Sequence, residues 1–323
     1  MLTVTRDMIL PTTVTGSYPR PLWFDRSLDG RSFKSALGDS LFREQYLDAV
    51  AGIIAEQEAA GLDIVTDGDS RFDLTVGGKS WFFYPIERLG GIEGHRDTSR
   101  GWMSRHGLRP GKILWEVQEA YQPAVVRRKL TRGPLEYAAL WQVAQRLTDR
   151  PVKFGAICAP AVASMLWDEF YKDDKAMILD LCDIMNAEFR ALADAGCPLI
   201  QVEEPPHHSR ALQEGTTDAD LEFQTEAFNR QLAGVNAEIW VHTCWGNPNQ
   251  QVCTQISAFT PASWRLNAWV RNSRSASVHS GCWTRMWCGG SSTWISGQPA
   301  AATSRNSAFM MSQRSRIISL SSS

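Results

Sequence analysis

Strand-like and helix-like segments alternate along most of this chain of 323 residues, and that alternation restricts its fold more than any other feature. Short apolar or β-branched runs predict strands, and the amphipathic runs between them predict helices. Apolar strands that alternate with helices are typical of a parallel sheet. We predict strands at 12–19, 62–69, 152–160, 199–205 and in the middle of 238–247, and helices at 40–60, 134–148, 173–195 and 217–233.

Functional side chains gather where these strands end, and this predicts a TIM, or (β/α)8, barrel in which about five βα units are recognisable. The active sites of such barrels lie at the carboxyl ends of the strands. An open, doubly wound sheet is the alternative, although no Gly-rich phosphate-binding fingerprint follows the first strand. We expect residues 1–250 to form an incomplete catalytic barrel. Residues 77–150, rich in Trp, Arg and Gly, are predicted to be an excursion that covers one end of it.

The composition changes abruptly near residue 250. Residues 251–323 contain no Asp, Glu or Lys, yet they contain seven Arg, seventeen Ser and five of the thirteen Trp. All 35 acidic residues precede this tail, so residues 1–250 carry a net charge of −9 and the tail carries +7. A disordered tail would be poor in Trp, Phe and Ile, and a folded one would show apolar periodicity. We interpret 251–323 as the product of a reading-frame shift, with an unusual basic extension as the alternative.

The overall composition argues against several classes of protein. The net charge of −2 offers no electrostatic attraction for nucleic acid, and no apolar run approaches the ~18 residues of a membrane-spanning helix. The N-terminus lacks an apolar signal core and the seven cysteines follow no disulfide framework, so we expect a cytoplasmic protein. Cys158, Cys182 and Cys197 have mainly apolar neighbours and are predicted to be small buried thiols.

A candidate metal site lies in the segment 238–247, which reads E-I-W-V-H-T-C-W-G-N. Residues i and i+2 of a strand project to the same side, so His242 and Cys244 can approach one ion. Imidazole nitrogen and thiolate sulfur are both ligands that suit zinc. The spacing therefore predicts two zinc ligands, while two unrelated core residues are the simpler alternative.

Four motifs together resemble the catalytic domain of cobalamin-independent methionine synthase. They are G-S-Y-P at 16–19, G-L-D-I-V-T-D-G-D-S-R-F-D at 61–73, Q-V-E-E-P at 201–205 and H-T-C at 242–244. The resemblance covers residues 12–247 and implies a zinc-containing TIM barrel that activates a thiol for alkylation. It implies that His242 and Cys244 bind zinc and that a later Glu and Cys complete the zinc site. It further implies that the Gly-Ser loop and the catalytic-site acids Asp69 and Glu203 hold the thiol.

Two departures from the family pattern bear on the substrate. Methionine synthases carry an additional N-terminal half that helps to hold a folate donor, whereas this chain reaches G-S-Y-P at residue 16. Arg20 and Pro21 replace an uncharged pair, and a guanidinium suits an anionic thiol such as a sulfonate. The chain therefore resembles the short branch that contains epoxyalkane:coenzyme M transferase. This implies that zinc-bound coenzyme M thiolate opens an aliphatic epoxide, with Gly16, Ser17 and Arg20 binding the substrate.

Other functions remain open from the sequence. Within the same class, the chain is predicted alternatively to transfer a methyl group to a small thiol such as homocysteine. A non-catalytic zinc or thiol binder on the same barrel is a second possibility. The third is an inactive, truncated or frameshifted product, because a barrel that lacks three strands exposes two sheet edges and much of its core.

Overall fold

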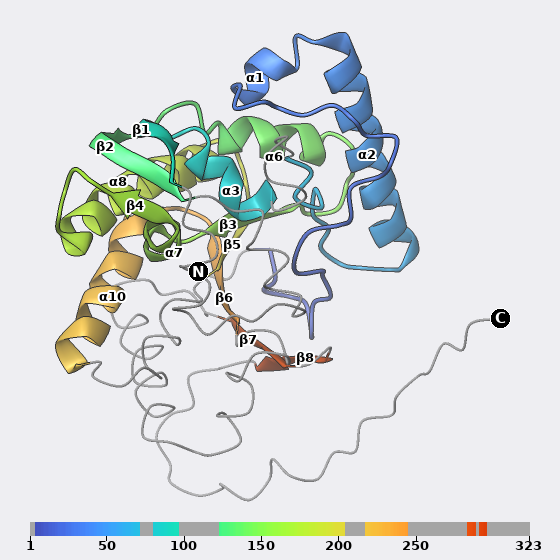
Figure 1. Cartoon of the computed structure of the whole chain (residues 1–323). Coiled ribbons are helices and arrows are strands. Elements are labelled where there is room, and N and C mark those ends of the chain that lie inside the picture. Colours follow the sequence, from blue (N-terminus) through green and yellow to red (C-terminus); the bar gives the residue numbers. More distant parts are fainter. Residues whose placement is uncertain are drawn as a thin grey trace, which may run out of the picture.

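The computed structural model describes residues 4–71, 80–96, 123–203, 217–244, 283–288 and 291–295 (Figure 1). The helices are α1 Phe33–Ala36, α2 Ser40–Ala59, α3 Ser80–Ile86, α6 Tyr137–Gln145, α7 Ala159–Ser164, α8 Asp174–Asp194 and α10 Asp218–Gln231. The strands are β1 Gly90–His95, β2 Ala124–Thr131, β3 Lys153–Ile157, β4 Leu166–Asp168, β5 Leu199–Glu203, β6 Glu238–Cys244, β7 Trp283–Cys288 and β8 Ser291–Ile295.

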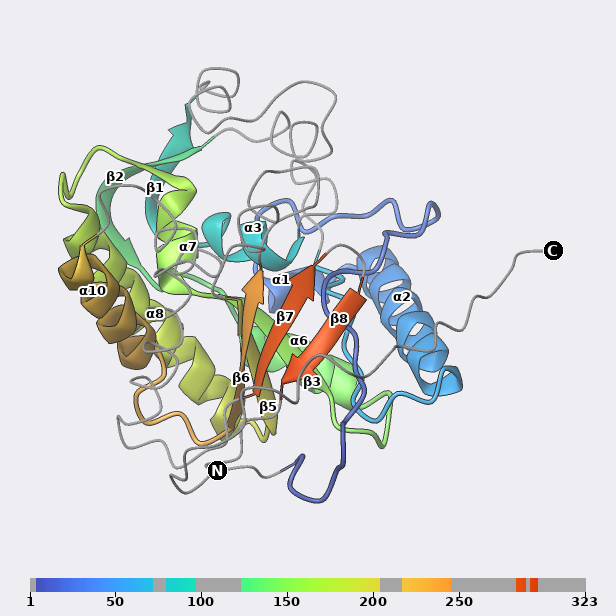
Figure 2. The same ribbon diagram turned by 90° about the horizontal axis from the view of Figure 1, so that it is seen from below.

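The larger sheet has the strand order β3-β5-β6-β7-β8. Strands β3, β5, β6 and β7 are parallel, and β8 runs antiparallel to β7. Figure 2 shows the arrowheads of β6 and β7 pointing to the same end of the molecule. The predicted alternation therefore gives a parallel sheet in which the carboxyl ends of β3, β5 and β6 share one edge.

Two N-terminal segments continue this sheet beyond β3 without forming regular strands. Val65 makes an isolated parallel bridge with Val152, and the Ile64 amide donates to the Thr12 carbonyl at 3.1 Å. The predicted strands at 12–19 and 62–69 thus lie next to the sheet, but they do not form a regular ladder of backbone hydrogen bonds. At Thr12 the amide and the hydroxyl both donate to the Asp63 carboxylate, at 2.8 and 2.7 Å, in place of a backbone carbonyl.

The predicted helices at 40–60, 134–148, 173–195 and 217–233 correspond to α2, α6, α8 and α10. Asp39, Asp173 and Thr217 cap α2, α8 and α10 by accepting backbone N–H groups of the first turn. One face of α8 is buried and contains Met177, Ile178, Leu181, Ile184, Met185, Phe189 and Leu192. The same face also buries Glu188, which accepts the Tyr137 amide at 3.0 Å and pairs with Arg132 at 2.6 Å.

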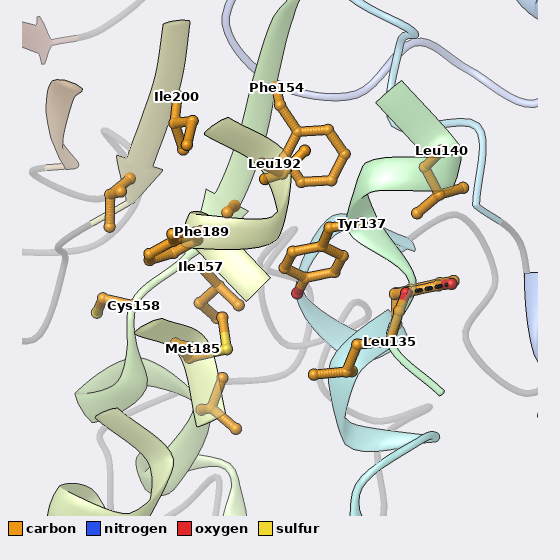
Figure 3. Packing of buried hydrophobic residues seen from close by; sticks show 14 of the residues in the cluster. Leu135, Tyr137, Leu140, Phe154, Ile157, Cys158, Met185, Phe189, Leu192 and Ile200 are labelled. Carbon is orange, nitrogen blue, oxygen red and sulfur yellow. Dashed lines mark hydrogen bonds between the residues drawn. The ribbon is translucent and has the colours of Figure 1, made fainter. Parts of the chain in front are cut away.

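The core lies mainly between the sheet and the helices packed on one of its faces. Phe154 and Ile200 from the strands pack with Phe189 and Leu192 of α8 and Leu140 of α6, as Figure 3 shows. A smaller apolar cluster of Ile64, Leu199 and Trp240 forms separately. Alternate residues of the strands therefore serve two different environments, as expected for a sheet that is buried on both faces.

The three cysteines predicted to be buried thiols, at positions 158, 182 and 197, are buried in the structure. Burial raises the pKa of the Cys197 thiol to about 12. Because the thiolate is the reactive form of cysteine, this side chain is chemically inert in the folded protein.

A second, three-stranded sheet has the order β1-β2-β4. Strands β1 and β2 come from the 77–150 segment and are antiparallel, whereas β4 runs parallel to β2. Since β3, α7 and β4 follow one another directly, this sheet is attached at the carboxyl end of β3, and Figure 2 shows it toward the end to which β6 points.

The architecture is mixed α/β with two partial sheets, and the described residues do not form a closed barrel. The segments 12–18 and 62–69 and the strands β3, β5 and β6 nevertheless neighbour one another in chain order, as strands of a TIM barrel do. No helix in the described ranges is long and apolar enough to cross a membrane.

The tail contributes only the backbone of β7 and β8 to the described structure, and its origin by a frame shift remains a proposal. We expect trypsin to cut first after arginines of 251–323, because a segment without selected apolar periodicity packs weakly. Mass spectrometry of the early fragments measures this. Arg128 is the control, since its side chain is 71% exposed but its backbone is held in β2. A tail cleaved no faster than Arg128 would contradict the interpretation.

Candidate functional site

The loops that follow the first two sheet segments are joined to each other by Ser17 and Asp69. The Ser17 hydroxyl donates to Oδ2 of Asp69 at 3.0 Å, and the Tyr18 amide donates to the Gly68 carbonyl at 3.0 Å. Gly16 has a backbone φ of 93°, which residues other than glycine rarely adopt. Glycine at this position therefore allows the chain to turn into this contact. The structure thus brings together the predicted site residues Gly16, Ser17 and Asp69.

The backbone of Asp69 is held in a left-handed conformation, with φ 54°. Its amide donates to Oδ1 of Asp67 at 2.9 Å, and Gly68 before it has φ 65°. Conformations of this kind cost about 1–3 kcal/mol and are often found at functional sites.

Arg71 fixes the Asp69 carboxylate from the other side. Its Nη2 donates to Oδ1 of Asp69 at 2.6 Å and to the Gly155 carbonyl at 3.2 Å. The guanidinium is fully buried and lies 4.8 Å from the ring centroid of Phe154. The sequence analysis did not assign Arg71. A usable signal was present, because a buried carboxylate at a strand end requires a cation nearby.

Arg71, Asp67 and Asp69 form one buried electrostatic group. Burial raises the pKa of Asp67, although the charge of Arg71 opposes that shift. Burial alone would lower the pKa of Arg71, but the Asp67 and Asp69 carboxylates outweigh it and raise the pKa. Within the described residues, Oδ2 of Asp67 and Nε and Nη1 of Arg71 have no hydrogen-bond partner. The group therefore combines one permanent cation with two acids away from solvent.

A second pair of predicted residues meets at the carboxyl ends of β5 and β6. Glu203 and His242 are register partners in the parallel ladder, and Nδ1 of His242 lies in close contact with Oε2 of Glu203. The contact lacks hydrogen-bond geometry, and the side chains of His242 and Glu203 are 11% and 9% exposed. A carboxylate beside one ring nitrogen of a histidine orients the ring, so that the other nitrogen can serve as a ligand.

The other oxygen of Glu203 is bound from within the sheet. Oε1 of Glu203 accepts from Nε2 of Gln201 at 2.6 Å, and Oε1 of Gln201 accepts from Nζ of Lys153 at 2.6 Å. Lys153 also donates to the Val14 carbonyl at 2.8 Å. These buried polar residues, Lys153 and Gln201, were also missed by the sequence analysis, because strand periodicity gives the face of a residue but not its partner.

Cys244 is the last residue of β6, two positions after His242. The side chain of Cys244 lies outside the described residues, so its projection to the same side as His242 stays a prediction. In the part of the chain that the structure describes, no group of three or more His, Cys, Asp or Glu side chains is arranged to hold a metal ion. The donor chemistry of His242 and Cys244 still fits zinc, as two ligands of a larger set.

Arg20 does not join the Asp69 or Glu203 group through its described hydrogen bonds. Its guanidinium donates to the carbonyl oxygens of Phe24 and Arg26 and stacks on the Phe24 ring, with 5.0 Å to the ring centroid. These contacts close the loop that follows Gly16–Pro19. Glu204, His207 and His208, which follow Glu203 in the sequence, lie outside the described residues.

Comparison with protein families assigns this arrangement. A family model described as the catalytic domain of cobalamin-independent synthase matches residues 10–262. The chain belongs to that family. Membership in the cobalamin-independent synthase family confirms the resemblance found at 12–247, whereas a closer relationship to epoxyalkane:coenzyme M transferase is not supported by these matches. The matched range ends at residue 262, inside the Ser-, Arg- and Trp-rich tail.

Curated relatives and solved structures agree with the family assignment. The methionine synthases of Sulfurisphaera tokodaii and Saccharolobus solfataricus are 31% and 30% identical over 74% of this chain. The chain spans 62% and 64% of their lengths. A B12-independent methionine synthase from a Shewanella species has a TM-score of 0.61 and 20% identity, covering 82% of this chain and 71% of that one. This structural likeness establishes the fold.

Proposed function

We propose that this chain carries the zinc-dependent thiol alkylation of its family, with methyl transfer to a small amino-acid thiol such as homocysteine as its reaction. The observation that carries the proposal is the contact between Glu203 and His242 at the carboxyl ends of β5 and β6. It lies at the strand ends where the sites of TIM barrels are built, and His242 is the position that the family motif gives to zinc. The match to the family over residues 10–262 supports the same reaction class.

His242 and Cys244 would hold the metal, together with ligands outside the described residues. Zinc, when bound, supplies the chemistry that lowers the pKa of a thiol so that it is present as the nucleophilic thiolate. The Nδ1 atom of His242 faces the Glu203 carboxylate, and this contact restricts the orientation of the imidazole ring. The chain thus prepares one ligand before a metal arrives, which reduces the entropy lost on binding.

The charges near the strand ends favour a thiol that carries an ammonium group. Asp67, Asp69 and Glu203 are acidic, and the Ser17 hydroxyl lies against Asp69. A substrate ammonium would be attracted to these carboxylates, whereas a sulfonate would be repelled by them. Ser17 and Asp69 are the residues that we propose to bind the polar end of the substrate, with Arg71 holding Asp69 in place.

Coenzyme M with an epoxide is the competing substrate pair. It depends on Arg20 meeting a sulfonate, and the described hydrogen bonds of Arg20 run instead to the Phe24 and Arg26 carbonyls. For this reason we propose an amino-acid thiol as the substrate. Coenzyme M with epoxypropane serves as the comparison in the assay.

The test uses cobalt as a spectroscopic replacement for zinc. After zinc content has been measured on the purified full chain, the cobalt-loaded protein is titrated with L-homocysteine and, separately, with coenzyme M. We expect a sulfur-to-cobalt charge-transfer band to grow at lower concentrations of homocysteine. A band that grows only with coenzyme M, followed by consumption of epoxypropane, would favour the epoxide reaction. No binding of metal and no band with either thiol, in this chain and in one whose reading frame is restored from codon 251, would contradict the proposed function.

A further inference from the structure

The turn that carries Asp69 begins at Thr66, and the backbone of Thr66 is bonded to a helix. Two residues earlier, the Ile64 amide donates to the Thr12 carbonyl at 3.1 Å. A regular parallel ladder would continue two residues further along each segment, with the Thr66 amide donating to the Val14 carbonyl. The Thr66 amide donates instead to a side chain of α2. The first sheet segment therefore does not fix the start of this turn.

Gln57 of α2 makes both backbone contacts that a neighbouring strand would otherwise make. Its Oε1 accepts from the Thr66 amide at 2.9 Å, and its Nε2 donates to the Thr66 carbonyl at 2.9 Å. Nε2 also donates to the Ile53 carbonyl, one helical turn earlier in α2, at 3.2 Å. The Gln57 side chain is buried, so rotating its amide would leave polar groups without partners away from water. One side chain thus attaches the start of the turn to α2.

The same helix also touches the turn at Gly68. A Cβ atom at this position would lie 2.9 Å from both Cδ1 and Cγ2 of Ile53, which is too close for two carbon atoms that are not bonded. Ile53 and Gln57 lie on the same face of α2, one helical turn apart. The helix therefore holds the turn at two points, by hydrogen bonds at Thr66 and by packing at Gly68.

Hydrogen bonds within the turn connect Thr66 to Asp69. Oγ1 of Thr66 accepts from the Gly68 amide at 3.2 Å, and Oδ1 of Asp67 accepts from the Asp69 amide at 2.9 Å. The Asp69 carboxylate then reaches the Ser17 hydroxyl at 3.0 Å. Because the turn is short and bonded internally, a displacement of Thr66 would also displace the Asp69 carboxylate.

We propose that Gln57 is a positioning residue that, through Thr66, holds the Asp69 carboxylate where a substrate ammonium can reach it. Gln57 acts on the turn and is not itself a catalytic residue. The step from Asp69 to a substrate rests on the proposed function, whereas the dependence of the turn on Gln57 does not. A misplacement of about 1 Å that originates far from the reacting atoms can cost roughly 100-fold in rate. A buried amide beneath the turn can therefore determine how well a thiol is recognised.

The structural half of the proposal is tested on the full chain without metal or substrate. Gln57→Met keeps nearly the same side-chain length and removes both bonds to Thr66. Gln57→Glu keeps an acceptor for the Thr66 amide and places a carboxylate oxygen against the Thr66 carbonyl. In both variants we expect the Asp69 amide to exchange with solvent deuterium at least about 10-fold faster, as measured by NMR.

Asn186→Leu is the matched control. Asn186 of α8 is also a helical amide that binds backbone, since its Nδ2 donates to the Gln231 and Ala233 carbonyls at 3.1 and 2.8 Å. These contacts fix the end of α10 and do not involve the turn that carries Asp69. The control should therefore leave exchange at the Asp69 amide unchanged. Circular dichroism verifies that each variant is folded.

The functional half compares two thiols that differ in one group. L-homocysteine carries an ammonium group, and 4-mercaptobutyrate is the same molecule without it. Each is titrated into the cobalt-loaded protein, both in this chain and in one whose reading frame is restored from codon 251. We expect Gln57→Met to weaken the binding of L-homocysteine roughly 10-fold and to leave 4-mercaptobutyrate unchanged, because only the ammonium needs Asp69. A general loss of structure would weaken both thiols alike and leave the ratio of their affinities unchanged.

The outcomes separate this inference from the proposed function. Unchanged exchange at Asp69 in a folded Gln57→Met variant would overturn the positioning role. Faster exchange with an unchanged ratio of the two affinities would also overturn it, because the turn would then not control recognition. Faster exchange in a protein in which neither thiol gives a band, even without substitution, would support the role of Gln57 and contradict only the proposed function. Exchange at Asp69 that is as fast in Asn186→Leu as in Gln57→Met would overturn the inference.

Discussion

A Cys244→Ala variant is expected to lose zinc and thiol alkylation together. Because we interpret 251–323 as the product of a reading-frame shift, and the family resemblance places the remaining ligands after Cys244, the experiment is made on a chain whose reading frame is restored from codon 251. A thiolate ligand contributes more than an outer partner does, so the loss of zinc affinity should exceed the ~10–100-fold typical of outer-shell changes. Zinc content and the cobalt charge-transfer band are measured on the same preparation.

Cys197→Ala is the control for this variant. Cys197 is buried beside Leu199, to whose carbonyl it donates, and burial raises its pKa to about 12, so it remains a neutral thiol. Its replacement should leave zinc content and the cobalt band unchanged. If the restored chain kept full activity after Cys244→Ala, the zinc-thiolate mechanism would have to be abandoned.

An Arg71→Met variant is expected to lose about 3 kcal/mol of unfolding free energy. The substitution leaves Asp69 and Asp67 buried without their cation, and breaking a buried pair from one side typically costs about 3–5 kcal/mol. The lower end applies because Nε and Nη1 of Arg71 have no hydrogen-bond partner among the described residues, so their removal costs little. The midpoint and slope of urea unfolding provide the measurement.

Two further variants test whether the loss of unfolding free energy comes from the carboxylate that is left without its cation. Asp69→Asn added to Arg71→Met should recover part of the loss, since it removes one uncompensated charge. Arg128→Met, which breaks an exposed pair with Glu93, should change the unfolding free energy by less than about 1 kcal/mol. A loss in Arg71→Met no larger than in Arg128→Met would contradict the assignment of a buried, charged group.

Sequence patterns predicted the regular elements well where the periodicity is long. The apolar spacing of Phe42, Tyr46 and Val50 predicts the buried face of α2. The same reasoning predicted a strand at 12–19, where the structure has no regular strand. The Asp63 carboxylate, 51 residues away in the sequence, competes for the Thr12 amide. Competition of this kind depends on which segments become neighbours, and local periodicity contains no information about that.

Part of the candidate site was also predicted from the sequence. Residues at strand ends are recognisable from the chain, so Ser17, Asp69, Glu203 and His242 could be selected before the fold was known. Arg71 was not selected, although a buried carboxylate at a strand end requires a cation nearby. Its role depends on the fold, which brings its guanidinium within hydrogen-bond distance of the Asp69 carboxylate and of the Gly155 carbonyl on a later strand.

The sequence alone determined the order of strands and helices, the family motifs at the strand ends and the compositional break at 251, because each depends on residues close together in the chain. Tertiary structure decided the partners of the buried polar groups. Lys153 and Gln201 are 48 residues apart, and only the parallel register of β3 with β5 brings them within 2.6 Å. A buried polar atom must find a partner somewhere in the fold, and the pairing of strands selects which one.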